Sequence, residues 1–62
     1  MNLVRYHGYL IHLKWDQIFW RFMAAPAEPD LPILSRAVSR PFIAREAALL
    51  EAKRQIDRLL LH

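Results

Sequence analysis

Hydrophobic and polar residues alternate over residues 6–23, which is the spacing of a half-buried β-strand. Two alternating runs separated by a short polar stretch predict an antiparallel β-hairpin with one apolar face. The rest of the chain is expected to pack against that face. Six side chains form it: Tyr9, Ile11, Leu13, Ile18, Trp20 and Phe22.

Two turns are compatible with this alternation. A turn at residues 16–17 pairs Leu13 with Trp20, whereas a four-residue loop over 14–17 pairs Leu13 with Ile18. The dipeptide Asp-Gln lacks the glycine that tight hairpin turns prefer, which favours the longer loop. Both alternatives leave nearly the same side chains on the inner face.

Gly8 is the only glycine in the chain. A lone glycine within a strand pattern indicates a β-bulge, or a place where a large neighbour lies across the backbone. Residues 2–4, which precede it, are expected to extend the first strand of the hairpin.

After the hairpin, residues 24–30 contain two prolines and no apolar period, which predicts a loop. Residues 33–37 alternate again and predict a short third strand at the edge of the sheet, because Pro32 cannot donate a ladder hydrogen bond. A helix is predicted over about 42–61. It begins either with Ser39 as its cap or near Ala44, where no capping side chain is available.

The predicted helix has one apolar stripe with a period of 3.6 residues. Its members are Ala48, Leu49, Ala52, Ile56, Leu59 and Leu60. Leu50 and Leu61 are apolar on the opposite, charged face, with Ala47 between them, and form a possible seam for a helix-to-helix dimer. The expected fold class is α+β, a two- to three-stranded antiparallel meander packed against one long C-terminal helix, in a single domain over 1–62.

The size of the chain favours self-association. With 62 residues it buries only about 60% of the surface that its unfolded form exposes. Disulfides and thiolate metal sites are excluded because there is no cysteine, so a homodimer is the expected means of added stability. The same lack of cysteine favours the cytoplasm.

The net charge of +3 comes entirely from residues 31–62. This half of the chain is therefore the candidate for meeting an acidic partner. Charged residues interrupt the apolar residues at the N-terminus, so neither a signal peptide nor a membrane anchor is expected, and no membrane partner.

Two basic groups are candidate binding sites. Basic and aromatic side chains mix on the outer face of the hairpin, a pattern typical of sheets that bind a macromolecular partner or single-stranded nucleic acid. The members of this partner-binding group are His12, Lys14, Phe19 and Arg21. The second group, Arg36, Arg40 and Arg45, lies close to the predicted helix start and is the candidate anion site. The alternative for the second group is simple exposure to solvent.

Catalytic and metal chemistry find no support in the sequence. His7 and His12 are five residues apart on one strand, which places them on opposite faces, so they cannot share a metal ion. Ser35 and Ser39 are the only hydroxyl groups besides the tyrosines, and no histidine and carboxylate accompany either of them. We predict a protein that is not an enzyme and needs no cofactor.

Two motifs carry a resemblance to a group of short proteins. Tyr6-His7-Gly8-Tyr9-Leu10-Ile11 near the start, and Phe42, Arg45-Glu46-Ala47 and Ala52 to Asp57 near the end, resemble short ββα-type bacterial and phage accessory proteins. Ala44 stands where those proteins have a capping serine. The resemblance implies an accessory protein of a phage or mobile element, such as an inhibitor of host defence of the anti-CRISPR type.

These observations favour a small binding protein that occupies a surface on another protein or nucleoprotein complex. The alternative is a small basic protein that binds nucleic acid through the same residues.

Overall fold

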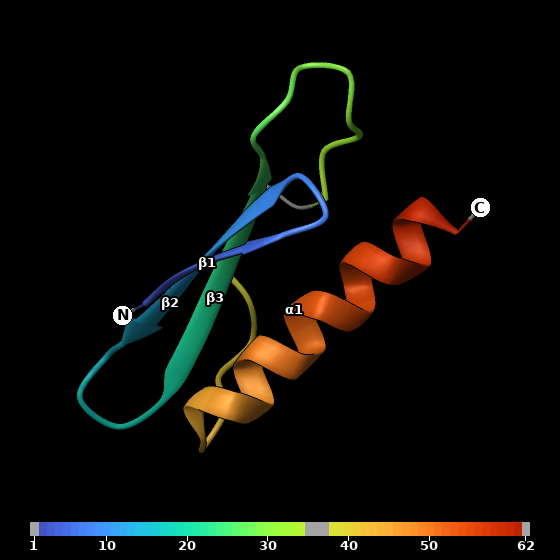
Figure 1. Cartoon of the computed structure of the whole chain (residues 1–62). Helices are drawn as coiled ribbons and strands as arrows, with labels where there is room; N and C mark the ends of the chain where they lie inside the picture. Colours follow the sequence, from blue (N-terminus) through green and yellow to red (C-terminus); the bar gives the residue numbers. More distant parts are fainter. Residues whose placement is uncertain (1, 35–37, 62) are drawn as a thin grey trace.

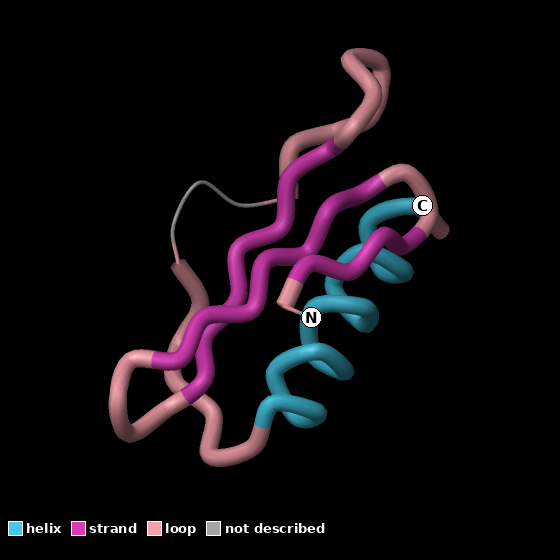
Figure 2. Tube along the Cα trace, turned by 60° about the vertical axis from the view of Figure 1, so that its left-hand side comes forward, coloured by secondary structure: helices cyan, strands magenta, loops and turns pink. Residues whose placement is uncertain are grey.

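The computed structural model describes residues 2–34 and 38–61, which form a three-stranded antiparallel sheet with one helix packed on it (Figure 1). Strand β1 spans Leu3–Tyr6, β2 spans Tyr9–Trp15 and β3 spans Trp20–Pro26, in the spatial order β1-β2-β3. Helix α1 spans Arg45–Leu60. The predicted fold class is confirmed. The trace in Figure 2 shows the helix on one side of the sheet, and no second helix among the described residues covers the other side.

Strand β1 and the turn that follows it depart from the sequence prediction. His7 and Gly8 have φ angles of 48° and 84°, and positive φ at both central residues is what a type I′ hairpin turn requires. Gly8 therefore lies in the turn between β1 and β2 and does not form a bulge. The second expectation for this glycine is confirmed, because a Cβ at Gly8 would lie only 2.6 Å from Cδ1 of Leu31. Residues 3–6 are consequently a separate strand and not an extension of β2.

The third strand of the sheet is β1, whereas the sequence predicted one over 33–37. Ile33 and Leu34 are in no strand, and 35–37 lie outside the described residues. Part of the predicted 24–30 loop is also strand, because β3 continues to Pro26. A strand at residues 3–6 needs only a two-residue turn to pair with β2, whereas a strand at 33–37 follows Pro32, which has no N–H for a ladder.

The outer edge of β3 is covered by the chain segment 39–42. Trp20 and Phe42 exchange two backbone hydrogen bonds of 2.7 Å each. Phe22 N–H donates to Oγ of Ser39 at 2.9 Å, and its carbonyl accepts from Ser39 N–H at 2.9 Å. Ser39 is thus an edge partner of the sheet and not the helix cap. The helix begins by the other predicted route, after Ala44, which has no side-chain cap hydrogen bond.

The β2–β3 register differs from both predicted registers. Leu13 pairs with Phe22, and Trp15 pairs with Trp20, so the turn is centred on Gln17 and Ile18. The pairing is shifted by two residues from the 16–17 turn, and side chains alternate with a period of two, so each strand residue still faces the predicted side. Only Ile18, which the shift places in the turn, is removed from the predicted inner face.

The core lies between the helix and the inner face of the sheet. Small alanines on the helix allow a close approach to the sheet, and Ile56 fills the space beside them. The buried residues are Tyr9, Ile11, Leu13, Phe22, Ala24, Phe42, Ala48, Ala52 and Ile56, with Leu49 and Leu59 packed against them. The predicted helix stripe is therefore confirmed except for Leu60, which is exposed.

Candidate functional site

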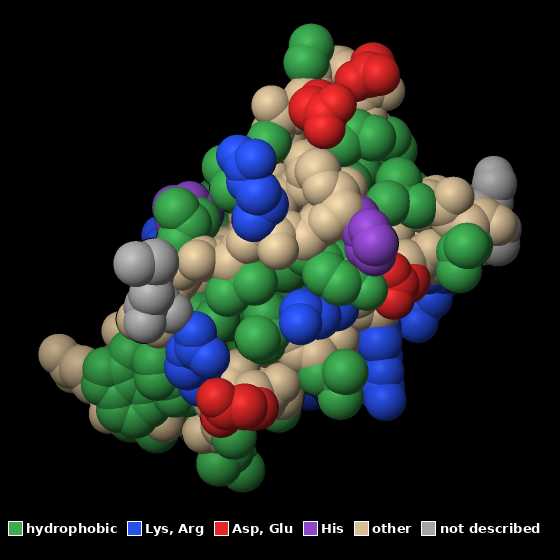
Figure 3. All heavy atoms as spheres, viewed as in Figure 1, with side chains coloured by type: hydrophobic (Ala, Val, Ile, Leu, Met, Phe, Trp, Pro, Cys, Tyr) green, Lys and Arg blue, Asp and Glu red, His purple; other side chains and the backbone are tan. Residues whose placement is uncertain are grey.

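Large hydrophobic side chains are exposed at the end of the sheet where β2 turns into β3. We call the exposed Trp15, Ile18 and Phe19, together with the half-buried Trp20 beside them, the tip cluster. Ile18 is 68% exposed, Trp15 is 54% exposed and Phe19 is 36% exposed. Ile43, which follows the Phe42 that pairs with Trp20, is 86% exposed. Hydrophobic side chains gather at this end of the molecule, at lower left in Figure 3.

The two tryptophans of the tip cluster form a cross-strand aromatic pair. Their ring centroids lie 5.4 Å apart with an angle of 47° between the ring planes. Trp15 and Trp20 are direct partners in the register and lie at a pair without mutual hydrogen bonds, where side chains approach most closely. Leu13 and Phe22 are buried on the inner face of the sheet. The helix begins only at Arg45, so the end of this face at Trp15 is left exposed.

The loop that carries Ile18 and Phe19 is held by the side chain of Asp16. The carboxylate accepts a hydrogen bond of 2.9 Å from Phe19 N–H and one of 3.5 Å from Ile18 N–H. Asp16 N–H donates to the Phe19 carbonyl at 3.0 Å, which closes the turn. The apolar side chains of the tip are therefore presented on a loop whose conformation is set before any partner arrives.

Arg21 completes this arrangement from the neighbouring strand. Its Nε donates to Oδ2 of Asp16 at 2.9 Å, and its Nη1 donates to the Ser39 carbonyl at 3.1 Å. The hydrogen bond from Arg21, followed by that from Phe19 N–H, lowers the pKa of Asp16 below its ordinary value of 3.8. Asp16 is thus charged at neutral pH, and its hydrogen bonds to the loop are charge-assisted.

The open face of the sheet beside the tip is basic. Lys14 on β2 is the direct cross-strand partner of Arg21 on β3, and His12 is the partner of Met23. None of the residues of β1, β2 and β3 is acidic. Arg5, Lys14 and Arg21 share this face with Leu3, Leu10 and Met23, so the surface is both cationic and apolar.

The predicted partner-binding residues lie close to one another. His12, Lys14 and Arg21 are on the open face of β2 and β3, and Phe19 is in the adjoining turn. Their role in binding stays a prediction. Sequence reasoning missed Ile18, because both predicted registers placed it on the inner face, and it missed Trp15, which one register paired with Ile18 and the other placed in the loop. The signal was present in Asp16, which favours turns and commonly bonds to the N–H groups two and three residues after it.

Both described members of the predicted anion site make contacts within the chain. Arg40 lies over the ring of Phe42, with the guanidinium carbon 4.5 Å from the centroid. Arg45 donates from Nε to the side-chain oxygen of Asn2 at 3.1 Å and contacts Glu46 at 3.4 Å. Arg36 lies outside the described residues. The role of these arginines in anion binding remains a prediction, and each described one already has a contact within the chain.

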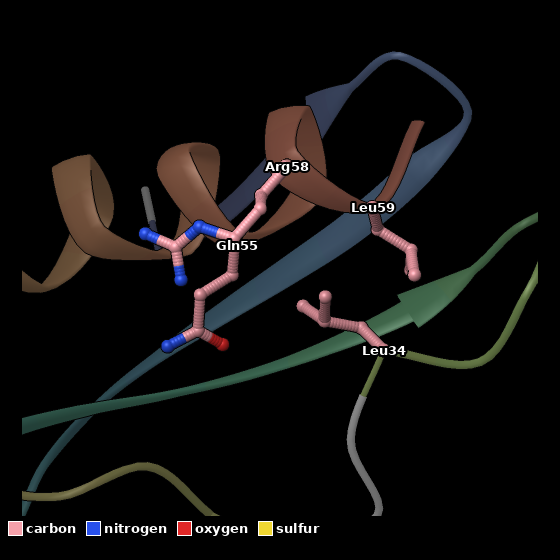
Figure 4. A pocket seen from close by; sticks show the side chains of 4 residues that line it. All are labelled: Leu34, Gln55, Arg58 and Leu59. Atoms are coloured by element: carbon pink, nitrogen blue, oxygen red, sulfur yellow. The ribbon is translucent and has the colours of Figure 1, made fainter. Parts of the chain in front are cut away.

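A pocket of about 380 Å³ lies between the C-terminal half of α1 and the segment before residue 35 (Figure 4). It is lined by Leu34, Gln55, Arg58 and Leu59. Gln55 donates to Glu51 at 3.1 Å. These described side chains offer apolar contact, one amide and one guanidinium group.

A second polar group joins β1 to the helix. The Tyr6 hydroxyl lies 2.9 and 3.0 Å from the two carboxylate oxygens of Asp57, and Lys53 Nζ lies 5.2 Å from the centroid of the Tyr6 ring. The hydrogen bond to Asp57 raises the pKa of Tyr6 above its ordinary value of 10.0. Since this group connects two elements of the fold, we interpret it as a structural contact.

Searches of the described residues found no group of three or more histidine and carboxylate side chains that could hold a metal ion. Nor does any helix in this part of the chain have the length and apolar character needed to cross a membrane. Comparisons with protein-family models, with curated proteins and with solved structures found no match to the chain.

Proposed function

We propose that this chain is a non-enzymatic protein-binding module that inserts its tip cluster into an apolar groove of a protein partner. One observation carries the proposal: Trp15, at the end of β2, and Ile18, in the turn that follows, are each more than half exposed, and the Asp16 side chain accepts hydrogen bonds from the N–H groups of that turn. Exposed clusters of this kind mark interaction sites, and tryptophan is among the residues enriched at binding hot spots. A preformed loop lowers the entropy cost of binding.

The flanking charges indicate the chemistry of the partner. Lys14 and Arg21 lie beside the apolar cluster, and the strands themselves carry no acidic residue, although Arg21 is paired with Asp16 of the turn. A groove rimmed by carboxylates would match both features, with the cations speeding encounter and the aromatic side chains contributing most of the affinity. The outer-face residues His12, Lys14 and Arg21 would then meet the rim.

The experiment uses the immobilised full chain and lysate of the cell from which it comes. Ile18→Ser is the test variant, and Leu61→Ser is the matched control, because Leu61, the residue after the helix, is 83% exposed. We expect at least one protein to be retained by the wild type and by the control and lost with Ile18→Ser. With that protein purified, Trp15→Ala should weaken binding by about 30-fold or more. Identical retained proteins for the wild type and Ile18→Ser would refute the proposal.

Nucleic-acid binding is the second candidate, and the Lys14–Arg21 pair on an acid-free sheet favours it. Against it, His12 is the one aromatic ring among the outward-facing strand residues, which include no phenylalanine, tyrosine or tryptophan on which bases could stack. Gel retardation of single-stranded and duplex DNA and RNA separates the candidates. Binding through several phosphates should weaken steeply between about 50 and 200 mM salt, whereas binding through the tip cluster should not.

The biological setting is proposed from the sequence resemblance alone. A short binding protein with this architecture suits an accessory role in a phage or mobile element, where occupying a surface is enough to inhibit a host-defence complex. The proposal places the protein in the cytoplasm, since its sequence has no cysteine to form the disulfides common in small secreted domains. Identification of the captured partner tests this setting directly.

A further inference from the structure

The two edge strands of the sheet differ in whether their outward backbone groups are hydrogen-bonded. Leu13 N–H donates to the Asn2 carbonyl at 2.8 Å, so the even-numbered residues of the first strand are those that bond to β2. The backbone N–H and C=O groups of Leu3 and Arg5 therefore point away from the sheet. No backbone hydrogen bond from another described segment reaches them, and both residues are exposed.

At the β3 edge, the outward backbone groups are hydrogen-bonded within the chain. There, the outward backbone groups of Trp20 and Phe22 are bonded to Phe42 and Ser39. No segment among residues 2–34 and 38–61 bonds to the β1 edge, and its residues Leu3–Tyr6 include no proline and no bulge. An uncovered edge is a template for another strand.

We infer that the free edge of β1 pairs with β1 of a second copy of this chain. The two strands would run antiparallel with Val4 on the two-fold axis, giving one sheet of six strands, three from each copy. Leu3 then lies opposite Arg5 of the other copy, and these residues exchange about four backbone hydrogen bonds across the axis.

The strand sequence selects this register over the two neighbouring ones. Moving the axis to Arg5 would set two arginines directly opposite each other, which is unfavourable, and would bring Leu3 opposite the turn residue His7. Moving it to Leu3 would leave Arg5 and Tyr6 without a partner inside the strand Leu3–Tyr6. With the axis at Val4, the outward backbone groups of Leu3 and Arg5 are bonded to each other across the axis, and the charges of Arg5 are separated.

The contact also covers apolar surface at the edge. Leu3 is 43% exposed on the open face, and Val4 is half-buried on the helix face. The helix packs chiefly against β2 and β3, which leaves the outer side of β1 accessible. Since β1 has four residues, the interface is small and the dimer should be a weak one, dissociating at about micromolar concentration.

The inference does not rest on the proposed function, because the edge and the tip cluster are separate surfaces. Antiparallel pairing would place the two tip clusters at opposite ends of the dimer, so that both stay accessible.

Sedimentation velocity of the full chain, at concentrations from about 1 to 500 μM, tests the dimer. We expect the mass to rise from monomer to dimer. Arg5→Ala keeps the outward N–H and should still dimerise, whereas Arg5→Pro removes it and should weaken the dimer about tenfold or more. Circular dichroism verifies that both variants fold. A monomer at every concentration, or equal dimerisation of the two variants, would overturn the inference.

Single cysteines test the register, since the chain has no cysteine of its own. Val4→Cys places two thiols opposite each other at a pair without hydrogen bonds, where Cα atoms are about 4.5 Å apart and a disulfide can form. Leu3→Cys is more exposed but diagonal to its symmetry mate, beyond the roughly 7 Å limit for a disulfide. We expect Val4→Cys to form covalent dimers at least tenfold faster under mild oxidation. Equal rates, or faster linkage through Leu3→Cys, would overturn the pairing.

Discussion

Replacement of Gly8 by alanine tests how the first turn joins β1 to the core. Gly8 has a φ of 84°, in the region where an L-residue costs roughly 1–2 kcal/mol. The added Cβ would also lie 2.6 Å from Leu31 Cδ1 and 3.2 Å from Glu28 Oε2. Leu31 is packed against the core and can move aside only by leaving its rotamer, at about 1 kcal/mol.

Together these effects destabilise the folded state by about 2–3 kcal/mol. Alanine also lowers the conformational entropy of the unfolded chain, which reduces the net loss by roughly 0.5 kcal/mol. We therefore expect Gly8→Ala to lower the free energy of unfolding by about 2 kcal/mol. For a domain of this size, that corresponds to a fall in Tm of about 8–16 °C. Urea titration and thermal melts followed by tryptophan fluorescence measure both quantities.

A double-mutant cycle with Leu31→Ala separates the backbone cost from the contact. In the Leu31→Ala background, Gly8→Ala should cost only about 1 kcal/mol, since the side chain in its way is gone. If Gly8→Ala lowers the free energy of unfolding equally in both backgrounds, the contact with Leu31 does not contribute to the loss. A Gly8→Ala variant within about 0.5 kcal/mol of the wild type would refute the reasoning about the turn as a whole.

Three further predictions concern the core and the two polar contacts. Ile56→Ala should lower the free energy of unfolding by about 2–5 kcal/mol, whereas Leu61→Ala, at an 83% exposed position, should change it by less than about 0.5 kcal/mol; equal losses in urea would contradict the assigned core. The pKa of Asp16 is lowered by Arg21, so its contribution to stability is present above the ordinary value of 3.8 and is lost as pH falls through the lower folded value. The stabilities of the wild type and Asp16→Asn should therefore converge in acid, and a constant difference down to pH 2 would argue against the contact. The pKa of Tyr6 is raised, so its contribution is complete below pH 10.0 and is lost as pH rises through the higher folded value. The advantage of the wild type over Tyr6→Phe should vanish in strong alkali, as urea titrations across that range would show.

The side chains that face the core could be predicted from the sequence because periodicity survives errors of pairing. The β2–β3 register lies two residues away from one predicted pairing, yet Leu13 and Phe22 still face the helix. The side-chain period of a strand is two, so an even shift changes the partners and preserves the faces. Likewise, the 3.6-residue spacing identifies the buried side of α1 without any knowledge of what it packs against.

The tertiary structure alone decided which apolar residues stay uncovered. Alternation marks Trp15 and Ile18 as belonging to an apolar face, but burial requires another element above them. Because the Asp16 side chain captures the N–H groups of the turn and α1 begins only at Arg45, the end of the hairpin extends past the helix cover.

The edges of the sheet, like its exposed end, could not be predicted from the sequence. Leu3–Tyr6 reads as the start of a longer strand until Gly8 is seen at a positive φ, and the cover over β3 comes from residues 39–42, distant in sequence. Local pattern determined the faces of each element, because a face depends only on spacing along the backbone. Edges and exposed ends depend on contacts between distant segments, so only the folded chain settles them.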